Sequence, residues 1–349
     1  MSTIRDVARR ARVSIATVSR VISRNPHKVS DATRGRILKA VKELDYRPNA
    51  LAQGLIMKKS MTLGVIIPDI SNPYYAEIVR GIQDGAEVLG YAVVLQNTDR
   101  KKERIIKCIQ VLRDKQADGI LFSGGRIHGD EILSALEEIA GRVVVIGRYD
   151  VTSPAVRVDN AGGATQAVQH LIDLGHEGTG FISGPKTSTS IIDRFEGYRA
   201  ALERQGLRYE KGWVKQGNLT PESGYQAAKE ILKLKTRPSA ILACNDLMAF
   251  GAIHAAKELG LSVPGEVSVV GFDNIPLSSY FEPPLTTVEI PMYSVGMAAM
   301  QMLADLLAGR EVEHLRLFKT HLRVRGSTGA SFSARKRGRK KCLTHPDPG

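Results

Sequence analysis

The stretch VSIATVSRVISRNP, residues 13–26, decides how the N-terminal part of the chain folds. Its hydroxyl, aliphatic and basic residues recur at helical spacing, and Ser14 stands where a helix N-cap is expected. One side of the expected helix is aliphatic, and the other is small or polar with one arginine. The aliphatic side comprises Val18, Val21 and Ile22, and the polar side comprises Ala16, Ser19, Arg20 and Ser23. Pro26 and its neighbours end the pattern.

The residues on either side of this stretch predict two further short helices. Thr3 is a candidate N-cap with Asp6 in the capping-box position, and Ser30 is a candidate N-cap after the break. We expect inward stripes formed by Ile4, Val7, Ala8 and Ala11 in the first helix and by Ile37, Leu38, Val41 and Leu44 in the third. Two short helices on a tight link, backed by a third, predict a helix-turn-helix head over residues 1–47.

The positive charge of the chain is concentrated at its ends. Residues 1–60 contain 14 Lys and Arg against 4 Asp and Glu, and residues 331–349 contain 6 against 1, whereas the residues between them contain 29 against 31. Because a solvated surface usually mixes its charges, so lopsided an N-terminal module predicts a polyanionic partner. The tail segment ARKRGRKK either adds nonspecific attraction to DNA or is a solvated extension.

Composition indicates a cytoplasmic globular protein of two or three domains. The chain has 349 residues, 43% of them hydrophobic, which is enough for a large buried interior. It has no apolar run of about 18 residues, and its N-terminal sequence MSTIRDVARRARVS is charged throughout, so we expect neither a membrane span nor an export signal. Cys108, Cys244 and Cys342 are far apart, which fits a reducing compartment and argues against disulfides and a zinc site.

From Thr62 onward, short β-rich runs alternate with amphipathic helical stretches. The runs are TLGVIIP, AVVLQN, GILFSG, VVVIG, TGFISG, AILACN and VSVVGFD. The helical stretches include residues 74–90, 103–115, 161–175, 190–206, 220–234 and 246–260. This alternation predicts parallel sheets covered by helices on both faces, and the length allows two such sheets with a ligand cleft at the carboxyl ends of their strands. The expected fold is a helical head followed by a two-lobed α/β core.

The sequence resembles the lactose and galactose repressor (LacI/GalR) family of bacterial transcription regulators from residue 3 to about residue 328. The segments that carry the resemblance are DVARRARVSIATVSRV, YRPNALAQGL, VIIPDISNPYYAEIVRGI, DRFEGYRAAL, NDLMAFGAIHAAKELGLSVPGEVSVVGFDN and PPLTTVEIP. Within the family, the pattern is most similar to the catabolite control proteins of the A type. The resemblance implies a homodimer with a DNA-binding head, a hinge helix and a core similar to periplasmic sugar-binding proteins.

This resemblance also divides the chain. The hinge helix is expected at 48–60 and the core at 61–328, followed by a basic disordered tail at 329–349. Within the core, lobe one is expected at about 61–160 plus 292–322, and lobe two at about 161–291 plus 323–328.

The resemblance implies that the residues of the second helix that read the bases are Ile15, Ala16 and Arg20. An arginine can contact guanine through two hydrogen bonds, and small apolar side chains fit beside thymine methyl groups. Groups that hold phosphates set the register on DNA. The remaining DNA-binding candidates are Ser14, Thr17, Ser19 and Asn49. The alternative is an ordinary solvated helix in a small bundle.

Leu55 in the linker has two interpretations. It is either a lone apolar residue that packs against the core or, as the resemblance implies, a wedge that enters the minor groove at the operator centre and kinks the DNA. We favour the wedge. A hinge helix that forms only when two copies meet over DNA would let the core control binding, since a small change in lobe spacing decides whether the pair can form.

The resemblance places a small-molecule effector, a sugar or a sugar derivative such as a sugar phosphate, between the two lobes. The implied effector-binding residues are Asn72, Tyr74, Tyr75, Arg148, Ser188, Ser190, Arg194, Leu219, Asn245, Asp246 and Asp273. Arginine, carboxylate and amide groups suit sugar hydroxyls, because they form paired hydrogen bonds. Asp246 has a second interpretation as a cap of the helix that follows it, and Tyr74 or Tyr75 as part of a dimer interface.

Two departures from the family bear on the effector. Leu219 stands where members with a purine corepressor carry a second aromatic residue, which argues against a purine. Gln301 stands where catabolite control proteins carry an arginine for their phosphorylated carrier protein, and an amide cannot grip phosphate as a guanidinium does, although Tyr293 is retained. We therefore expect a repressor that responds to its own small molecule, with the carrier-protein and purine versions as alternatives.

Other classes of protein fit the sequence less well. GxSxG, HExxH and paired cysteines do not occur, SGPKT does not fit a phosphate-loop frame, and the histidines are scattered, so we predict no catalytic residues, cofactor or metal. A transport sugar-binding protein would need an export signal and no helix-turn-helix. An architectural DNA-binding protein would not need a two-lobed core.

Overall fold

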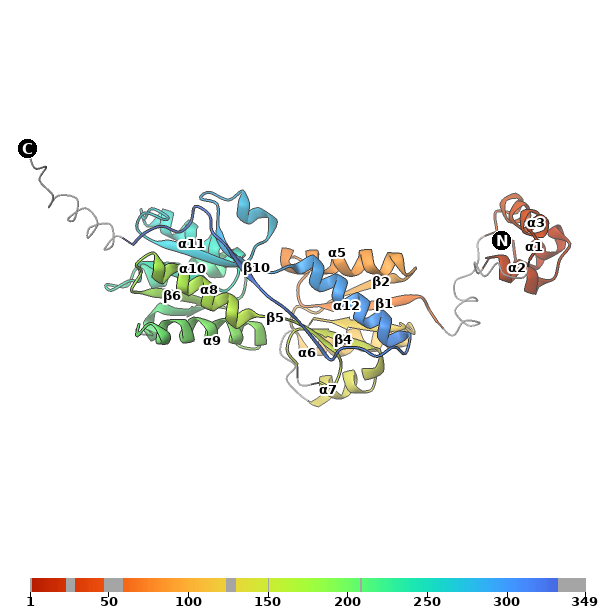
Figure 1. The fold of residues 1–349 in the computed structure, drawn as a ribbon, viewed down its shortest axis with the longest axis horizontal. Coiled ribbons are helices and arrows are strands. Elements are labelled where there is room, and N and C mark those ends of the chain that lie inside the picture. The colour runs from red at the N-terminus through yellow and green to blue at the C-terminus, as the bar shows by residue number, and fades with distance from the viewer. Residues whose placement is uncertain are drawn as a thin grey trace, which may run out of the picture. The chain divides into compact units, whose positions relative to one another are not determined.

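The computed structural model describes residues 2–22, 29–46, 59–123, 130–149, 151–207 and 209–331. The chain forms two compact units, Met1–Met61 and Thr62–Gly349, and Figure 1 colours them along the sequence. The predictions for Asn49, Leu55 and the basic tail beyond Ser331 concern residues outside the described ranges.

In its described residues, the first unit contains three helices, α1 (Ile4–Ala11), α2 (Ile15–Ile22) and α3 (Asp31–Glu43). The predicted capping box at the start of α1 is confirmed: the Asp6 amide donates to Thr3 Oγ1, and the Thr3 amide donates to the Asp6 carboxylate at 2.9 Å. Arg12 ends α1 in the left-handed region, with φ 54°. The Thr17 amide then donates to Ser14 Oγ at 3.2 Å, so Ser14 satisfies one of the free amides at the start of α2.

The head has a small core, made of Val7, Ala8, Ala11, Val18, Val21, Ile37 and Ala40. One prediction for α3 is wrong. Leu38 is 51% exposed, because the inward side of α3 follows Ile37 at i+3 and i+7 and leaves Leu38 about 100° away. Ser30 is the N-cap of α3, as predicted, but its side chain makes no capping bond to the helix and its hydroxyl donates to Thr33 Oγ1.

The second unit contains two six-stranded sheets, one in each lobe (Figure 1). The first has the order β11-β5-β4-β3-β1-β2, and the second has the order β12-β10-β9-β8-β6-β7. The strands of the first are β1 (Thr62–Ile67), β2 (Ala92–Asn97), β3 (Gly119–Phe122), β4 (Val143–Ile146), β5 (Ala155–Val158) and β11 (Leu315–Phe318). Those of the second are β6 (Thr179–Ser183), β7 (Val214–Gln216), β8 (Ala240–Ala243), β9 (Ser268–Asp273), β10 (Thr286–Glu289) and β12 (His321–Arg323).

All strand pairs are parallel except β10 with β12, which confirms the predicted parallel sheets. The central strands are buried on both faces. In β1, for example, Val65 packs into one hydrophobic cluster and Ile66 into another. Such strands read as continuous apolar runs, which is why the sequence reveals them.

Helices cover both faces of each sheet. In lobe one, α5 (Pro73–Val88) packs beside α12 (Met292–Leu307), and α6 (Lys102–Asp114) packs beside α7 (Asp130–Glu137). In lobe two, α8 (Asn160–Asp173) packs beside α9 (Thr189–Arg204), and α10 (Pro221–Leu232) beside α11 (Asp246–Glu258). In the first sheet, β2 lies on one side of β1 and the later strands lie on the other, and β7 and β6 are related in the same way in the second sheet. Because each crossover is right-handed, connections that run in opposite directions put their helices on opposite faces of the sheet. Short 3₁₀ turns occupy Ala140–Arg142, Lys211–Trp213 and Pro276–Ser279.

The chain passes between the lobes three times: from β5 to α8, from β10 to α12, and from β11 to β12. The third crossing comes earlier than expected, because β12 starts at His321 and pairs with β10, whereas lobe one was predicted to run to about 322. The predicted disordered tail also starts too early. The Gly329 amide donates to Ser268 Oγ, and the buried Ser331 donates its amide to the Leu174 carbonyl, so these residues belong to lobe two.

Candidate functional site

The exposed side of α2 is the candidate DNA-binding surface. Val18 and Val21 are buried, whereas Ile15 is 45% exposed and Ala16 and Arg20 lie on the surface. At about 100° per residue, the predicted base-reading residues and Ser19 fall within an arc of about 140°. The structure thus brings the described candidates together on one side of a helix whose exposed groups are small enough for close approach to a major groove.

A cavity of about 190 Å³ lies between the two lobes of the core. Its walls come from the segments that follow β1, β2 and β3 in the first sheet, from those that follow β6, β7 and β8 in the second, and from the end of β9. This is the carboxyl edge of both sheets, where ligands bind in open α/β folds. Nine of the eleven predicted effector residues line it: Asn72, Tyr74, Tyr75, Ser188, Ser190, Arg194, Leu219, Asn245 and Asp273.

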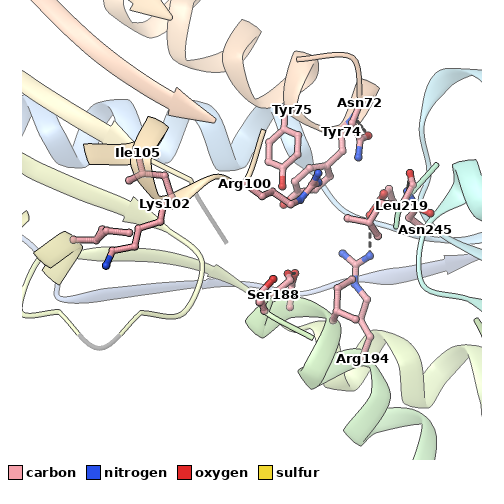
Figure 2. Close-up of a pocket in the computed structure, with 15 residues that line it drawn as sticks. Asn72, Tyr74, Tyr75, Arg100, Lys102, Ile105, Ser188, Arg194, Leu219 and Asn245 are labelled. Atoms are coloured by element: carbon pink, nitrogen blue, oxygen red, sulfur yellow. Dashed lines mark hydrogen bonds and ion pairs between the residues drawn. The ribbon is translucent and has the colours of Figure 1, made fainter. Parts of the chain in front are cut away.

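Arg194 on α9 is the most constrained side chain of the cavity. It is 5% exposed, its Nε donates to Asn160 Oδ1 at 2.9 Å, and its Nη1 donates to the Cys244 carbonyl. Its guanidinium carbon lies 3.8 Å from the centroid of the Phe272 ring, a cation–π contact. Figure 2 shows the side chain reaching from α9 toward Leu219 and Asn245. These contacts fix the guanidinium before any ligand arrives.

Asp273 faces Arg194 from the end of β9. Its Oδ1 lies 3.2 Å from Arg194 Nη1, within ion-pair distance but not aligned as a hydrogen bond, and this oxygen accepts no hydrogen bond from the described residues. Burial raises the pKa of Asp273 to about 7, and the charge of Arg194 opposes this rise. A buried carboxylate oxygen that lacks a donor costs free energy, which a ligand hydroxyl would recover.

Three residues that line the cavity have left-handed backbone conformations although none is glycine. Asp273 has φ 116°, Leu219 has φ 75° and Arg100 has φ 60°. Such conformations cost about 1–3 kcal/mol each for most residues and concentrate at functional sites. Their occurrence around one cavity is independent support for a binding role.

The lobe-one wall is aromatic. Asn72 caps α5 by accepting from the Tyr74 amide at 3.0 Å, and Pro73 occupies the first helical turn. The cap fixes the direction in which α5 starts, and the rings of Tyr74 and Tyr75 meet edge to face at 4.9 Å. Burial raises the pKa of both phenols, so both remain protonated at neutral pH.

Lobe two contributes hydroxyl and amide groups. Ser188 and Ser190, at the start of α9, are hydrogen-bonded to each other at 2.9 Å. Asn245 caps α11 through its Oδ1 and donates its Nδ2 to the Leu219 carbonyl at 3.2 Å. Asn245 therefore holds the cavity wall in shape as well as lining it.

Arg148 and Asp246 do not line this cavity. Arg148 follows β4, is about half exposed, and pairs with Asp193 of α9 at 2.6 Å, so its ion pair connects the two lobes. Asp246 is completely buried and accepts hydrogen bonds from the Ile275 amide and the Ser278 and Thr287 hydroxyls. Its alternative interpretation as a helix cap is also wrong, because Asn245 is the cap. Asp246 instead ties α11 to the segments that follow β9 and form β10.

Six lining residues were not anticipated: Arg100, Lys102, Ile105, Ile132, Thr187 and Ile191. Thr187 and Ile191 flank the predicted residues Ser188 and Ser190, so their place at the start of α9 was the available signal. Arg100 and Lys102 follow β2, and the position of β2 beside β1 at the carboxyl edge was the available signal.

Taken together, these features define a class of protein: a helix-turn-helix head joined to a two-lobed ligand-binding core. Residues 3–49 match the family model described as bacterial regulatory proteins, lacI family, and residues 168–328 match that of a periplasmic binding protein-like domain. Catabolite control protein A of Priestia megaterium is 40% identical over 314 residues, which are 89% of this chain and 94% of the relative.

Two solved structures are similar to most of the chain. A lac repressor dimer bound to operator and the anti-inducer ONPF has a TM-score of 0.86 at 30% identity, covering 94% of this chain and 99% of that one. A complex of the transcriptional regulator CelR with cellobiose has a TM-score of 0.72 at 32% identity, covering 94% and 100%.

The chain belongs to the LacI family of bacterial transcription regulators. It is therefore a DNA-binding regulator with an effector-binding core, and not an enzyme. Among the described residues, no helix is long and apolar enough to cross a membrane.

Proposed function

We propose that this chain is a homodimeric repressor that acts in the cytoplasm and whose operator affinity is set by a small molecule, a sugar or a sugar derivative, bound between the lobes. The observation that carries the proposal is the Asp273 carboxylate, which is buried beside Arg194 with one oxygen lacking a donor among the described residues. Hydroxyl groups of a sugar would donate to that oxygen. The relative solved with cellobiose supports a sugar as the class of effector.

The cavity explains how binding and regulation would be linked. Its walls belong to both lobes, so a ligand that contacts both favours one lobe arrangement over another. The ligand can shift the operator equilibrium only by its differential affinity for the two arrangements. Residues that hold the ligand should therefore affect the response to it more than operator binding without it.

A thermal-shift screen of sugars, sugar phosphates and nucleobases would identify the ligand. A ligand at about a hundred times its dissociation constant adds about 2.7 kcal/mol of stability. Asp273→Asn should weaken that ligand by about 5- to 150-fold, corresponding to about 1–3 kcal/mol, and should abolish the response of operator affinity to it. Asp305→Asn is the control, since Asp305 is a carboxylate on α12 that pairs with Arg310 and does not line the cavity. Full ligand response in Asp273→Asn would refute the assignment of the site.

The symmetry of the operator should match the twofold symmetry of the dimer. Two heads related by a twofold axis should select, from random DNA, a pseudo-palindrome of roughly 14–18 base pairs with a flexible pyrimidine–purine step at its centre. The lac repressor dimer bound to operator supports this arrangement. Selection of an asymmetric site would contradict a dimeric reader.

The 40% identity to catabolite control protein A favours a second candidate, a global regulator activated by a phosphorylated carrier protein. In this chain Gln301 is a neutral amide and presents no cation to a phosphate. Its amide nitrogen donates to both oxygens of Asp305, at 3.0 and 3.1 Å. Titrating the operator complex with such a phosphorylated protein distinguishes the candidates, because only the second expects tighter operator binding.

A further inference from the structure

Two cations lie on the lobe-one wall of the cavity, outside the set that the sequence suggested. Arg100 occupies the turn after β2, where Asp99 and Arg100 have φ 49° and 60°, and Lys102 is the first residue of α6. Both side chains line the cavity, and Figure 2 shows Arg100 beside Tyr74 and Tyr75.

The charge of Arg100 is only partly compensated, by Asp69 and by a hydrogen bond with the Tyr75 phenol. Its Nη1 is 3.9 Å from Asp69 Oδ2, the outer limit of an ion pair, and the other Asp69 oxygen accepts from the amide and hydroxyl of Ser71. Its Nη2 is buried and has no hydrogen-bond partner among the described residues. A buried donor without an acceptor is costly, and more so when it is charged, so an oxygen supplied by a ligand would relieve this site.

Lys102 is held only loosely. It pairs with Glu131 at 3.1 Å, but the two side chains are 43% and 70% exposed. Pairs so exposed to solvent contribute little, so Lys102 is free to exchange Glu131 for a ligand anion at small cost.

The lobe-two wall offers hydrogen-bond donors. Thr187, Ser188 and Ser190 line the cavity at the start of the 16-residue helix α9. Ser188 is the N-cap of α9, but its side chain does not accept a hydrogen bond from the amides of the first helical turn. These amides therefore have no side-chain cap. Helix starts favour anions through these amides and the positive end of the helix dipole.

The charge balance of the cavity points the same way. Of the described residues that line it, Arg100, Lys102 and Arg194 are cations, and Asp273 alone carries a carboxylate. That carboxylate is already 3.2 Å from Arg194. A neutral sugar could use the Arg194–Asp273 pair, but it would leave the positive charge of the lobe-one wall without a counter-charge from the ligand.

We infer that the effector carries an anionic group, a phosphoryl or carboxylate group, seated between Arg100 and the start of α9. This inference rests on the proposed function and adds the chemical class of the effector to it. The neutral part of the same molecule would lie toward Arg194 and Asp273. Arg100 is then the residue that separates a sugar phosphate or sugar acid from the parent sugar.

The first test uses inorganic phosphate as the probe on the full-length protein, with chloride at matched ionic strength as the control. Saturable binding to the wild type should weaken about 10- to 100-fold in Arg100→Gln, the loss expected for a charge-assisted hydrogen bond. Lys102→Gln should weaken binding less than Arg100→Gln does, because the Lys102 amine points away from Arg100 and pairs with Glu131. Lys101→Gln is the matched control: it removes a neighbouring cation that does not line the cavity, and it should change the affinity by less than about twofold. Absence of phosphate binding, or equal losses in Arg100→Gln and Lys101→Gln, would overturn the inference.

The second test compares matched sets of a free sugar, its phosphate and its sugar acid. Preference for either anionic form, lost in Arg100→Gln, supports the inference and identifies the anionic group. A parent sugar that binds as tightly as both anionic forms overturns it.

Operator affinity separates this inference from the proposed function. If a neutral sugar alone changes operator affinity and Asp273→Asn removes the response, the proposed function stands and the anionic site fails. If phosphate binds through Arg100 but no ligand changes operator affinity, the anionic site stands and the proposed function fails.

Discussion

The ion pair between Arg148 of lobe one and Asp193 of lobe two should stabilise the arrangement of the lobes, and a substitution that breaks it tests this. Asp193→Asn removes the charge while keeping the shape of the side chain. The pair is short, 2.6 Å, but its side chains are 46% and 23% exposed. Pairs of this exposure contribute about 0.2–1 kcal/mol, and we expect the upper half of that range because Asp193 is partly buried.

This magnitude fixes the expected size of the effect. A contribution of about 0.5–1 kcal/mol changes the equilibrium constant between lobe arrangements by about 2- to 5-fold. If the effector binds the arrangement seen here, its apparent dissociation constant in Asp193→Asn rises by up to that factor, and by the whole of it where that arrangement is the minor one. The hydrogen bond from Thr189 Oγ1 to the Arg148 carbonyl does not involve the charge and should persist, which keeps the effect small.

Calorimetry with the ligand found by the screen would measure this change at low salt and at about 1 M salt, where charges are screened within about 3 Å. We expect the difference between wild type and variant to disappear at high salt. Unchanged affinity at low salt would refute the ion pair as a tie between lobes. A loss of ligand affinity well above tenfold would show that Asp193 contacts the ligand directly. Asp305→Asn is the control: it breaks an ion pair within one lobe and should have no effect on ligand affinity.

Three further predictions concern the head, the packing of lobe one and the buried carboxyl. Arg20→Ala should cost about 1–3 kcal/mol of operator binding and relax the preference at one symmetric base pair, measured by fluorescence anisotropy; equal weakening on every sequence would make Arg20 a phosphate contact. Gly296→Ala should lower the free energy of unfolding in urea by about 1–3 kcal/mol, because its Cβ would lie 2.1 Å from the Ile78 carbonyl oxygen of α5. Gly141→Ala, with open space around it, should be nearly neutral, and similar losses in both would rule out the steric cause. Since burial raises the pKa of Asp273 to about 7, its protonated form stabilises the folded state below about pH 4, and this contribution is lost as the pH rises through 7. The free energy of unfolding of Asp273→Asn relative to wild type should therefore rise from pH 4 to pH 7, by at most about 4 kcal/mol, and a constant difference would contradict the raised pKa.

The elements that the sequence revealed are those with a strong local signal. The capping box at Thr3 and Asp6 and the apolar strand β1 need only neighbouring residues to be recognised. The elements it missed depend on distant partners. Strands β5, β7, β10, β11 and β12 fall outside the seven predicted runs. Each has only three or four residues, and β7, β11 and β12 lie at sheet edges, where exposed polar residues carry no apolar run. Leu38 was misplaced because the side of a helix that faces inward is set by its neighbours.

The candidate site shows the same division. Residues that begin a helix after a strand, such as Asn72 and Asn245, follow from topology alone. Arg100 lies in the charged run TDRKKER, which reads as a solvated surface. Asp99 and Arg100 have left-handed conformations in the turn that leads to the cavity, and the sequence gives only a weak signal for such conformations in residues other than glycine. Asp246 was misassigned because its hydrogen-bond donors come from segments about 30 and 40 residues further along the chain.

The three crossings between the lobes have a consequence for synthesis of the protein in the cell. Lobe one is incomplete until α12 and β11 have been made, and lobe two is incomplete until β12 and Ser331 have been made. The hydrophobic core of the head, as far as the structure describes it, lies by contrast within residues 2–46. At about 5–20 residues per second, tens of seconds separate the emergence of these two parts from the ribosome. The DNA-binding unit can therefore be folded well before either lobe that regulates it is complete.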